Sequence, residues 1–167
     1  MLFACAAMTV IASCAFIFNT VQTTKAASAY YVEYRCYVQN VGWKGWTINH
    51  DCGTTEDSLR IEAIQVKLAG GGIPAGMSIR YRAHVQNIGW QSWVSNGATA
   101  GTTGQSLRLE AFEVQFVNAP LGTGVEYYAY VQNNGWGGTG VDGSIAGTTG
   151  QGLRVESIFI DYVTSVQ

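Results

Sequence analysis

Apolar and polar residues alternate strictly in three separate stretches of the chain, each about eight residues long. The apolar sets are Val32, Tyr34, Cys36 and Val38; Ile79, Tyr81, Ala83 and Val85; and Val125, Tyr127, Ala129 and Val131. A period of two over this length is typical of a β-strand with one buried face, and no helical period occurs in residues 30–167. We therefore predict an all-β chain in which each stretch forms one long, half-buried strand.

A second long strand is predicted near the end of each unit, and its apolar pattern changes phase at one point. The next inward residue after Leu109 is Phe112, a step of three. The same step leads from Ile61 to Ile64 and from Val155 to Ile158. Because an odd step would turn a regular strand over, we predict a β-bulge or corner at Glu110-Ala111 and at the equivalent positions.

Turn residues separate these strands. An Asn-x-Gly motif follows the first strand, and residues 90–94 of the middle unit are predicted to form a short second strand. Asn96-Gly97 and Asp142-Gly143 then predict tight hairpin turns. The first unit is one residue shorter here, so its loop at Asn49-His50-Asp51 must differ. Residues 70–74 and 118–122 are predicted to connect the units.

Three phrases recur in the same order, so the pattern is a true internal repeat. The hexapeptide Val85-Gln86-Asn87-Ile88-Gly89-Trp90 recurs as Val38-Gln39-Asn40-Val41-Gly42-Trp43 and as Val131-Gln132-Asn133-Asn134-Gly135-Trp136. The three tryptophans are 47 and 46 residues apart. The later phrases are Gly53-Thr54-Thr55, Gly101-Thr102-Thr103 and Gly147-Thr148-Thr149, then Leu59-Arg60-Ile61-Glu62, Leu107-Arg108-Leu109-Glu110 and Leu153-Arg154-Val155-Glu156. We predict one β-domain over residues 30–167, with repeats at 30–75, 76–122 and 123–167. Its expected architecture is a pseudo-threefold, β-prism-like fold, with a β-trefoil as the alternative.

The first 29 residues are predicted to be a secretory signal peptide. Residues 2–18 are almost wholly apolar or small, and Ala27-Ser28-Ala29 is a small-x-small cleavage site. The apolar run is short for a membrane-spanning helix. Ile11-Ala12-Ser13-Cys14 resembles a lipoprotein cleavage box, but the residues after Cys14 stay apolar. We therefore expect a secreted or extracellular protein, with association with the cell surface as an alternative.

Charge excludes some partners for residues 30–167. These 138 residues contain eight of the nine bases and all eleven acids, for a formal charge of −3. This is not the basic footprint of a protein that binds nucleic acid or an anionic membrane. Few charged residues beside many Gly, Thr, Asn, Gln and aromatic residues suit an extracellular β-protein with polar, uncharged loops.

The recurring Val-Gln-Asn-x-Gly-Trp, Gly-Thr-Thr and Leu-Arg-x-Glu phrases resemble the ChW repeat ("clostridial hydrophobic, with a conserved Trp") over residues 30–167. The resemblance implies a secreted or surface-attached protein of a Gram-positive bacterium. Such repeats are thought to mediate adhesion or to bind glycans or proteins. The chain departs from the pattern at Glu56, where the other repeats have Gly104 and Gly150, and at Thr139, where the others have Trp46 and Trp93. A site built on those positions is not threefold equivalent.

Two of the four cysteines, Cys5 and Cys14, lie in the predicted signal peptide. The other two, Cys36 and Cys52, take the places of Ala83 and Ala100 of the second repeat and of Ala129 and Ala146 of the third. A paired replacement in an exported chain predicts that the two positions touch and form a disulfide. The alternative is a pair of buried free thiols. A metal site is not predicted, because neither His50 nor His84 belongs to a ligand cluster.

Catalytic motifs are not recognisable, and we expect no enzyme activity and no cofactor. The repeated carboxylates Glu62, Glu110 and Glu156 each follow an arginine by two residues, which places both side chains on the same strand face. Such a pair is more often a structural ion pair than an acid and base in catalysis. We therefore interpret the Arg–Glu pairs as structural.

Sugar recognition needs flat aromatic faces and planar amides, and each repeat supplies both. The candidate ligand-binding residues are Gln39, Asn40, Trp43, Trp46, Gln86, Asn87, Trp90, Gln91, Trp93, Gln132, Asn133 and Trp136. A Gly-Trp in every repeat is also typical of a core wedge that packs the units together, and for Trp43, Trp90 and Trp136 this core position is the favoured interpretation. Trp46 and Trp93 are expected to be more exposed, and the Gly-Thr-Thr-Gly loops can be simple turns.

Two hypotheses of function remain. The first is a lectin-like carbohydrate-binding module with up to three weak sites, whose strength comes from multivalency. The second is an adhesive or structural module of the cell surface that binds protein and has no sugar ligand. Substitution of Trp93 and Gln91 separates them, because glycan binding would be lost with folding intact only under the first.

Overall fold

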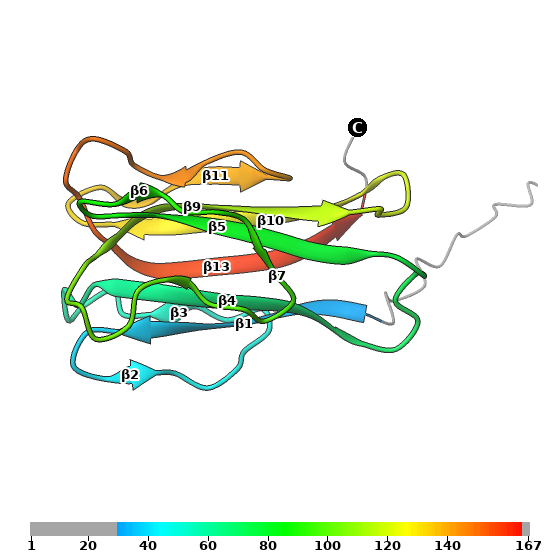
Figure 1. Cartoon of the computed structure of the whole chain (residues 1–167), viewed down its shortest axis with the longest axis horizontal. Coiled ribbons are helices and arrows are strands. Elements are labelled where there is room, and N and C mark those ends of the chain that lie inside the picture. Colours follow the sequence, from blue (N-terminus) through cyan, green and yellow to red (C-terminus); the bar gives the residue numbers. More distant parts are fainter. Residues whose placement is uncertain (1–29, 165–167) are drawn as a thin grey trace, which may run out of the picture.

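The computed structural model describes residues 30–164, and across these residues the chain forms strands and no helix (Figure 1). The strands of the first repeat are β1 (Tyr30–Val38), β2 (Gly42–Trp43), β3 (Cys52–Gly53) and β4 (Ile61–Gly70). Those of the second are β5 (Ser78–Val85), β6 (Gly89–Trp90), β7 (Val94–Ser95), β8 (Ala100–Gly101) and β9 (Leu109–Val117). Those of the third are β10 (Thr123–Val131), β11 (Gly135–Val141), β12 (Ala146–Gly147) and β13 (Val155–Thr164). The prediction of an all-β chain built from three repeats is confirmed.

Each repeat supplies the centre of one sheet. The two long strands of a repeat pair antiparallel, as β1 with β4, β5 with β9 and β10 with β13. The strand after the Asn-x-Gly turn pairs with the first long strand, so β2, β6 and β11 lie at one edge of their sheets. The long strands run along the long axis of the molecule (Figure 1). The arrangement of these sheets as a β-prism rather than a β-trefoil stays a prediction.

The fourth strand of each sheet comes from a different repeat. The short β8 of the second repeat pairs with β4 of the first, and β12 of the third pairs with β9 of the second. The ring is closed by β3 of the first repeat, which pairs with β13 of the third. The Gly-Thr-Thr phrase, interpreted from sequence as a turn, therefore begins in a strand that joins neighbouring repeats.

The core is formed by the inward faces of the three sheets. Every residue of the three predicted alternating sets is buried, including the large Tyr34, Tyr81 and Tyr127, which are completely buried. The second long strands add Ile64, Phe112 and Ile158 to the same apolar cluster. The alternation that predicted the first strands is confirmed in all three repeats.

The predicted bulge is confirmed in all three repeats. Val85 pairs with Leu109 but His84 pairs with Ala111, so Glu110 is the extra residue. Glu62 is extra in the first repeat and Glu156 in the third, at the same point of the sheet. The bulge restores the apolar side of the strand to the core after the three-residue step.

The hairpin turns agree with the predictions, but the short strand predicted at residues 90–94 does not. Asn96-Gly97 and Asp142-Gly143 have positive φ at both residues, as a tight hairpin turn requires. The predicted strand at 90–94 is interrupted, because β6 ends at Trp90 and β7 begins at Val94. In the shorter first repeat an isolated bridge between Tyr34 and Thr47 takes the place of β7.

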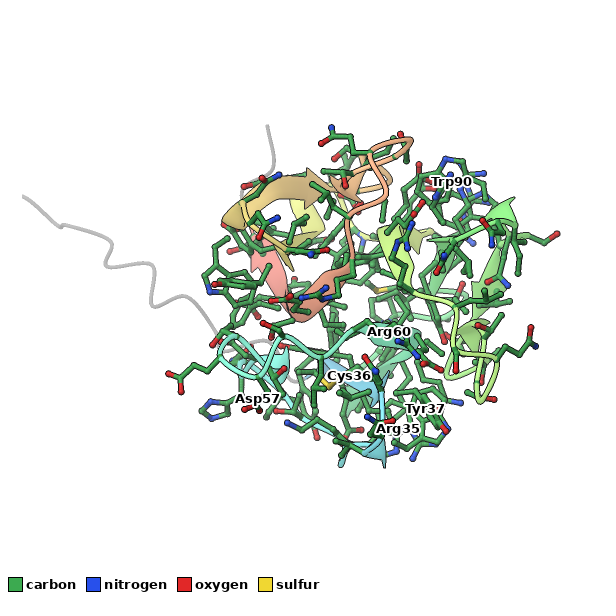
Figure 2. All side chains as sticks on the ribbon, turned by 90° about the vertical axis from the view of Figure 1, so that its left-hand side faces the viewer. Arg35, Cys36, Tyr37, Asp57, Arg60 and Trp90 are labelled. Atoms are coloured by element: carbon green, nitrogen blue, oxygen red, sulfur yellow. A yellow bond between two sulfur atoms is a disulfide. The ribbon has the colours of Figure 1, made fainter. Side chains whose placement is uncertain are left out.

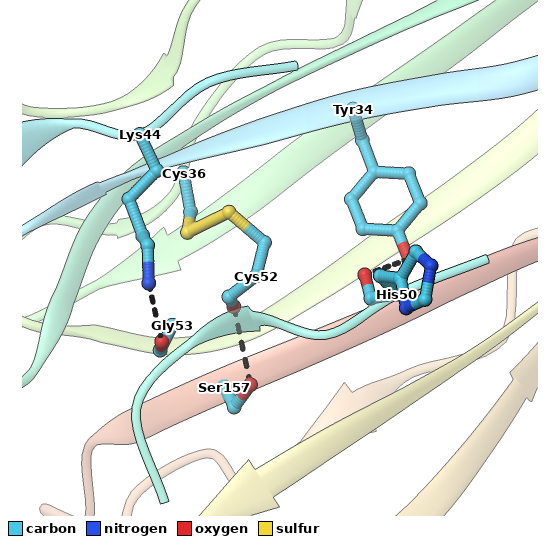
Figure 3. The surroundings of a disulfide bond; sticks show 7 residues. All are labelled: Tyr34, Cys36, Lys44, His50, Cys52, Gly53 and Ser157. Carbon is cyan, nitrogen blue, oxygen red and sulfur yellow. Dashed lines mark hydrogen bonds between the residues drawn. A yellow bond between two sulfur atoms is a disulfide. The ribbon is translucent and has the colours of Figure 1, made fainter. Parts of the chain in front are cut away.

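The predicted disulfide is present between Cys36 and Cys52, whose Cα atoms lie 5.9 Å apart (Figure 3). Cys36 is in β1, whereas Cys52 is in β3, which belongs to the sheet of the third repeat. The Ser157 hydroxyl of β13 donates a hydrogen bond to the Cys52 carbonyl oxygen at 3.2 Å (Figure 3). The disulfide therefore lies where the first and third repeats meet.

The predicted signal peptide, residues 1–29, lies outside the described residues. Across residues 30–164 we find no helix with the length and apolar character needed to cross a membrane.

Candidate functional site

The Asn-x-Gly turn fixes where the first Trp of each repeat lies. Asn40, Asn87 and Asn133 have φ of 61°, 62° and 63°, a left-handed conformation that asparagine tolerates. The turn pairs each Trp with an outward residue of the first strand. The pairs are Tyr37 with Trp43, His84 with Trp90 and Tyr130 with Trp136. Each Trp is therefore directed to the outer face of its sheet.

A core position for these tryptophans is thus wrong. Trp43 and Trp90 are half-buried and Trp136 is 43% exposed. Each packs edge-on against its outward partner, with ring centroids 5.5, 5.3 and 5.5 Å apart in the three repeats. Figure 2 shows Trp90 at the rim of the molecule, and it shows Cys36 further inside than Arg35 and Tyr37. The tryptophans form an outer aromatic layer instead of a core wedge.

In the first two repeats, cationic side chains cover the tryptophans. The Arg35 guanidinium carbon lies 4.8 Å from the ring centroid of Trp43 and 4.7 Å from that of Trp46. Arg82 lies at 4.7 Å from Trp90 and 4.8 Å from Trp93 in the same way. A guanidinium over an aromatic face is attracted by the ring quadrupole. Each of these repeats therefore binds a cation of its own between two tryptophans.

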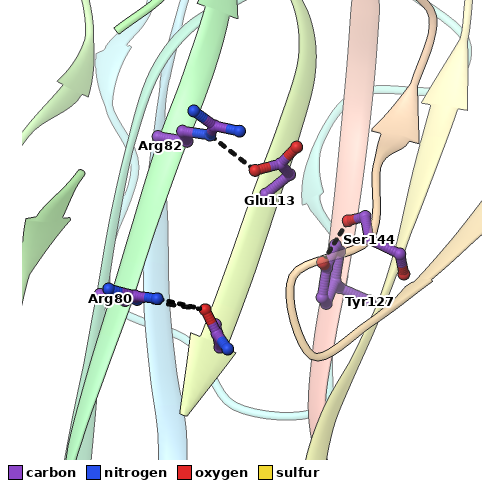
Figure 4. Close-up of polar contacts among 6 residues, drawn as sticks. Arg80, Arg82, Glu113, Tyr127 and Ser144 are labelled. Atoms are coloured by element: carbon purple, nitrogen blue, oxygen red, sulfur yellow. Dashed lines mark hydrogen bonds and ion pairs between the residues drawn. The ribbon is translucent and has the colours of Figure 1, made fainter. Parts of the chain in front are cut away.

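Polar partners on the second long strand fix these arginines. Arg35 Nε donates to Gln65 Oε1 at 2.7 Å, and Arg82 Nε lies 2.6 Å from Glu113 Oε2 (Figure 4). One step along the strand, Arg80 of the second repeat donates to Gln115 and also lies over Trp93. The expectation that Trp46 and Trp93 are exposed is wrong, since both are half-buried beneath these cations. Their ring faces are already occupied.

The third repeat has a different outer face. Tyr128 stands where Arg35 and Arg82 stand, and Phe159 stands where Gln65 and Glu113 stand. The rings of Tyr128 and Phe159 are tilted at 57° with centroids 6.2 Å apart. The second Trp is replaced by Thr139, which leaves this face without the covering layer of the other two repeats.

The result is an open cleft of about 220 Å³ lined by Tyr128, Trp136, Phe159 and Asp51. Asp51 comes from the first repeat. Because β3 pairs with β13 so that Cys52 faces Ile158, the preceding Asp51 lies beside Phe159 on the outer face. We call this the aromatic cleft. Its walls are three aromatic side chains and its acidic group is a carboxylate from the neighbouring repeat.

The acidic side of the aromatic cleft extends to Glu126, two residues before Tyr128 on β10. A hydrogen bond to Glu126 raises the pKa of the Tyr128 hydroxyl above its ordinary value, and partial burial and the charge of Glu126 raise it further. At physiological pH the Tyr128 hydroxyl therefore stays neutral beside the Glu126 carboxylate.

A second cleft, of about 240 Å³, lies on the first repeat. It is lined by Tyr31, Glu33, Trp46, Thr47, Ile48 and His50. Its charged and aromatic groups are engaged, because the Lys67 ammonium lies 4.0 Å from the Trp46 centroid and 3.0 Å from the Glu33 carboxylate. It is a weaker candidate than the aromatic cleft.

The predicted amides do not converge on either cleft. Gln91 is held by the backbone of Gly101, because its Oε1 accepts from the Gly101 amide at 2.6 Å and its Nε2 donates to the Gly101 carbonyl at 3.2 Å. Gln86 Oε1 accepts from the Arg108 amide at 3.4 Å. The other amides, Gln39, Asn40, Asn87, Gln132 and Asn133, belong to the turns and line neither cleft.

Of the twelve predicted site residues, Trp136 lines the aromatic cleft and Trp46 lines the second cleft. Tyr128, Phe159 and Asp51 line the aromatic cleft but were not among the predicted site residues. A signal was present for the first two, because the aligned repeats show aromatic residues only in the third where the others have polar ones. No such signal marked Asp51, because it reaches the cleft by strand pairing between repeats.

The Arg–Glu pairs are structural ion pairs, as interpreted. The distances are 2.7 Å for Arg60–Glu62, 2.8 Å for Arg108–Glu110 and 2.7 Å for Arg154–Glu156. Each glutamate is the buried extra residue of a bulge, and its carbonyl oxygen accepts from the first Thr of a Gly-Thr-Thr phrase. The pairs therefore stabilise the contact between repeats. Within residues 30–164, no group of three or more His, Cys, Asp or Glu side chains could hold a metal ion.

Comparison with known proteins gives one result. The family model described as "Clostridial hydrophobic W" matches three stretches of the chain, residues 37–70, 84–118 and 130–163. Each match begins near the end of the first long strand of a repeat and ends near the end of its second long strand. Neither the search of curated proteins nor that of solved structures found a match.

Proposed function

The chain belongs to the ChW (Clostridial hydrophobic W) repeat family, and from this membership and its geometry we propose that it is a secreted carbohydrate-binding module. It acts by binding and not by catalysis. The observation that carries the proposal is the aromatic cleft of the third repeat, where Tyr128, Trp136 and Phe159 face solvent beside Asp51.

The lining of the aromatic cleft suits a sugar. Aromatic faces stack on the apolar C–H faces of a pyranose ring, and a carboxylate accepts hydrogen bonds from its hydroxyl groups. Ligand pockets commonly combine an apolar lining with few polar groups that fix orientation. The cleft supplies three rings and the Asp51 carboxylate in this combination.

The geometry favours one principal site over three equivalent ones. In the first and second repeats, Arg35 and Arg82 lie over the tryptophan faces on which a sugar would stack. In the third repeat Trp136 is not covered in this way and is 43% exposed. Affinity is therefore expected to come from one cleft and not from multivalency within the domain.

Secretion is part of the proposal and rests on the sequence of residues 1–29. A domain with an internal disulfide and polar, uncharged loops fits an oxidising compartment outside the cell. Its ligand would then be a cell-surface or extracellular polysaccharide.

The test is a glycan array and a pull-down of cell-wall polysaccharide with the full chain and two Trp variants. Trp136→Ala removes one wall of the cleft and is expected to reduce affinity up to about tenfold, the loss of one aromatic stacking contact. Trp93→Ala, the matched control in the second repeat, should retain binding, because Arg80 and Arg82 already cover that ring.

Circular dichroism must show that both variants are folded. Absence of saturable binding to any glycan by the folded wild type would contradict the proposal and direct the search to protein partners. Equal losses in both variants would place the site elsewhere than the aromatic cleft.

A further inference from the structure

Charge is distributed unevenly among the three repeats. Residues 30–75 contain four bases and five acids, and residues 76–122 contain three bases and two acids. Residues 123–167 contain one base and four acids, for a formal charge of −3. That one base is Arg154, which pairs with Glu156 at the bulge 2.7 Å away. The outer face of the third repeat therefore has acidic groups and no cation of its own.

The first two repeats show what this outer face binds. In each, a guanidinium lies between two tryptophan rings at 4.7–4.8 Å and is fixed by an oxygen of the second long strand. That oxygen is Gln65 Oε1 in the first repeat and Glu113 Oε2 in the second. Aromatic faces combined with an oxygen acceptor are the chemistry that recognises an organic cation.

The third repeat has an aromatic wall and nearby carboxylates, but it has lost the cationic side chain. Tyr128 replaces the arginine and Phe159 replaces its partner, so two aromatic rings stand where the other repeats have two polar side chains. Asp51 supplies the carboxylate at the mouth of the cleft, and Glu126 lies beside Tyr128. An aromatic surface with uncompensated carboxylates attracts a positive group from outside.

We propose that the aromatic cleft binds a cationic amino group carried by the ligand, so that the glycan it recognises contains amino sugars whose amines are not acylated. The inference rests on the proposed glycan-binding function and specifies its ligand class. The ammonium lies among the rings of Tyr128, Trp136 and Phe159 and pairs with the Asp51 carboxylate, while the sugar ring stacks on the remaining aromatic surface.

The test compares two tetrasaccharides with the same backbone, the tetramer of glucosamine and the tetramer of N-acetylglucosamine. Each is titrated calorimetrically into the full chain at mildly acidic pH, where the free amines are charged. The charged tetramer is expected to bind about tenfold more tightly, as a solvent-exposed cation–π contact combined with a carboxylate partner predicts. The preference should weaken with salt.

Equal affinities, or tighter binding of the acetylated tetramer, would overturn the inference and leave the glycan-binding proposal standing. Binding of neither tetramer, when the wild type does bind another glycan on the array, would overturn the inference alone. Failure to bind any glycan would remove both proposals. The titrations and the glycan array together distinguish the three results.

Two sets of variants locate the site. Asp51→Asn should remove most of the preference for the charged tetramer, whereas the control Glu33→Gln should keep it, because Glu33 pairs with Lys67 on another sheet. The double variant Tyr128→Arg with Phe159→Glu copies the Arg82–Glu113 pair of the second repeat and should abolish binding by supplying an internal cation. Should the double variant not fold, an unchanged preference in the exposed Asp51→Asn variant would still contradict the inference.

Discussion

Three buried tyrosines show what a single residue contributes to each repeat. Tyr34, Tyr81 and Tyr127 are completely buried at equivalent inward positions. Their hydroxyls donate to the carbonyl oxygens of His50, Ala98 and Ser144, each in the loop of the same repeat (Figures 3 and 4). The alternating pattern predicted that these side chains point inward. It could not predict the acceptor, because that depends on where a loop crosses over the core.

Burial of Tyr34 predicts loss of stability at alkaline pH. Desolvation raises the pKa of Tyr34 from its ordinary value of 10.0 to about 12, with a smaller contribution from Asp51. Below pH 10 the tyrosine is protonated in both states. Between pH 10 and 12 the unfolded chain releases the proton and the folded chain keeps it, so the free energy of unfolding should fall by up to about 3 kcal/mol from this residue.

Denaturant titrations across this pH window check the prediction with two variants. Tyr34→Phe should reduce the slope of stability against pH between 10 and 12, because the titrating group is gone. Tyr37→Phe, on the outer face of the same strand, is the matched control for the loss of a tyrosine hydroxyl that is not in the core. A wild-type stability that stays flat up to pH 12 would contradict the argument.

At the scale of the elements, each of the short strands β3, β8 and β12 depends on a glycine. Gly53, Gly101 and Gly147 have φ of 133°, 107° and 100°. A Cβ on Gly101 would lie 2.6 Å from the Ala63 Cα and closer still to the Glu62 carbonyl oxygen, both in the neighbouring repeat. The glycine is therefore required because two backbones approach each other, and not only because the chain turns.

Gly101→Ala is predicted to destabilise the fold by more than about 3 kcal/mol, because the new methyl group meets backbone that cannot move without separating β8 from β4. Gly104→Ala is the matched control, since Gly104 has a φ of 68° and nothing within 4 Å of an added Cβ. The control should cost only about 1 kcal/mol, the price of the left-handed conformation. Similar losses in the two variants would show that conformation alone, and not close approach, accounts for Gly101.

The sequence predicted more of the fold than of the candidate site, for a physical reason. Strands, bulges and the disulfide follow from local alternation and from comparing the three repeats, so the Glu110 bulge and the Cys36–Cys52 pair were both predictable. The aromatic cleft depends on pairing between repeats, which brings Asp51 to Phe159. The local pattern around Trp136 contains no information about that partner.

At the scale of the whole molecule, closure of the ring is the feature that chain connectivity does not provide. The chain passes directly from the first repeat to the second and from the second to the third, but the third meets the first only through strand pairing between β13 and β3. The one disulfide among residues 30–164 fixes β3 at this junction. At the other two junctions the equivalent positions are alanines, Ala83 with Ala100 and Ala129 with Ala146.

The disulfide is therefore predicted to stabilise one junction in particular. The double variant Cys36→Ala with Cys52→Ala copies the other repeats and should lower the free energy of unfolding by about 3 kcal/mol, the chain-entropy value for a loop of this length. The Thr54, Thr102 and Thr148 amides each donate across a junction at 2.9 Å, which allows amide exchange to compare the three. Exchange should accelerate most at Thr54, because loss of the disulfide lets β3 leave β13 by local opening. Equal acceleration at all three amides would mean that the disulfide stabilises the domain as a whole and has no special role in closing the ring.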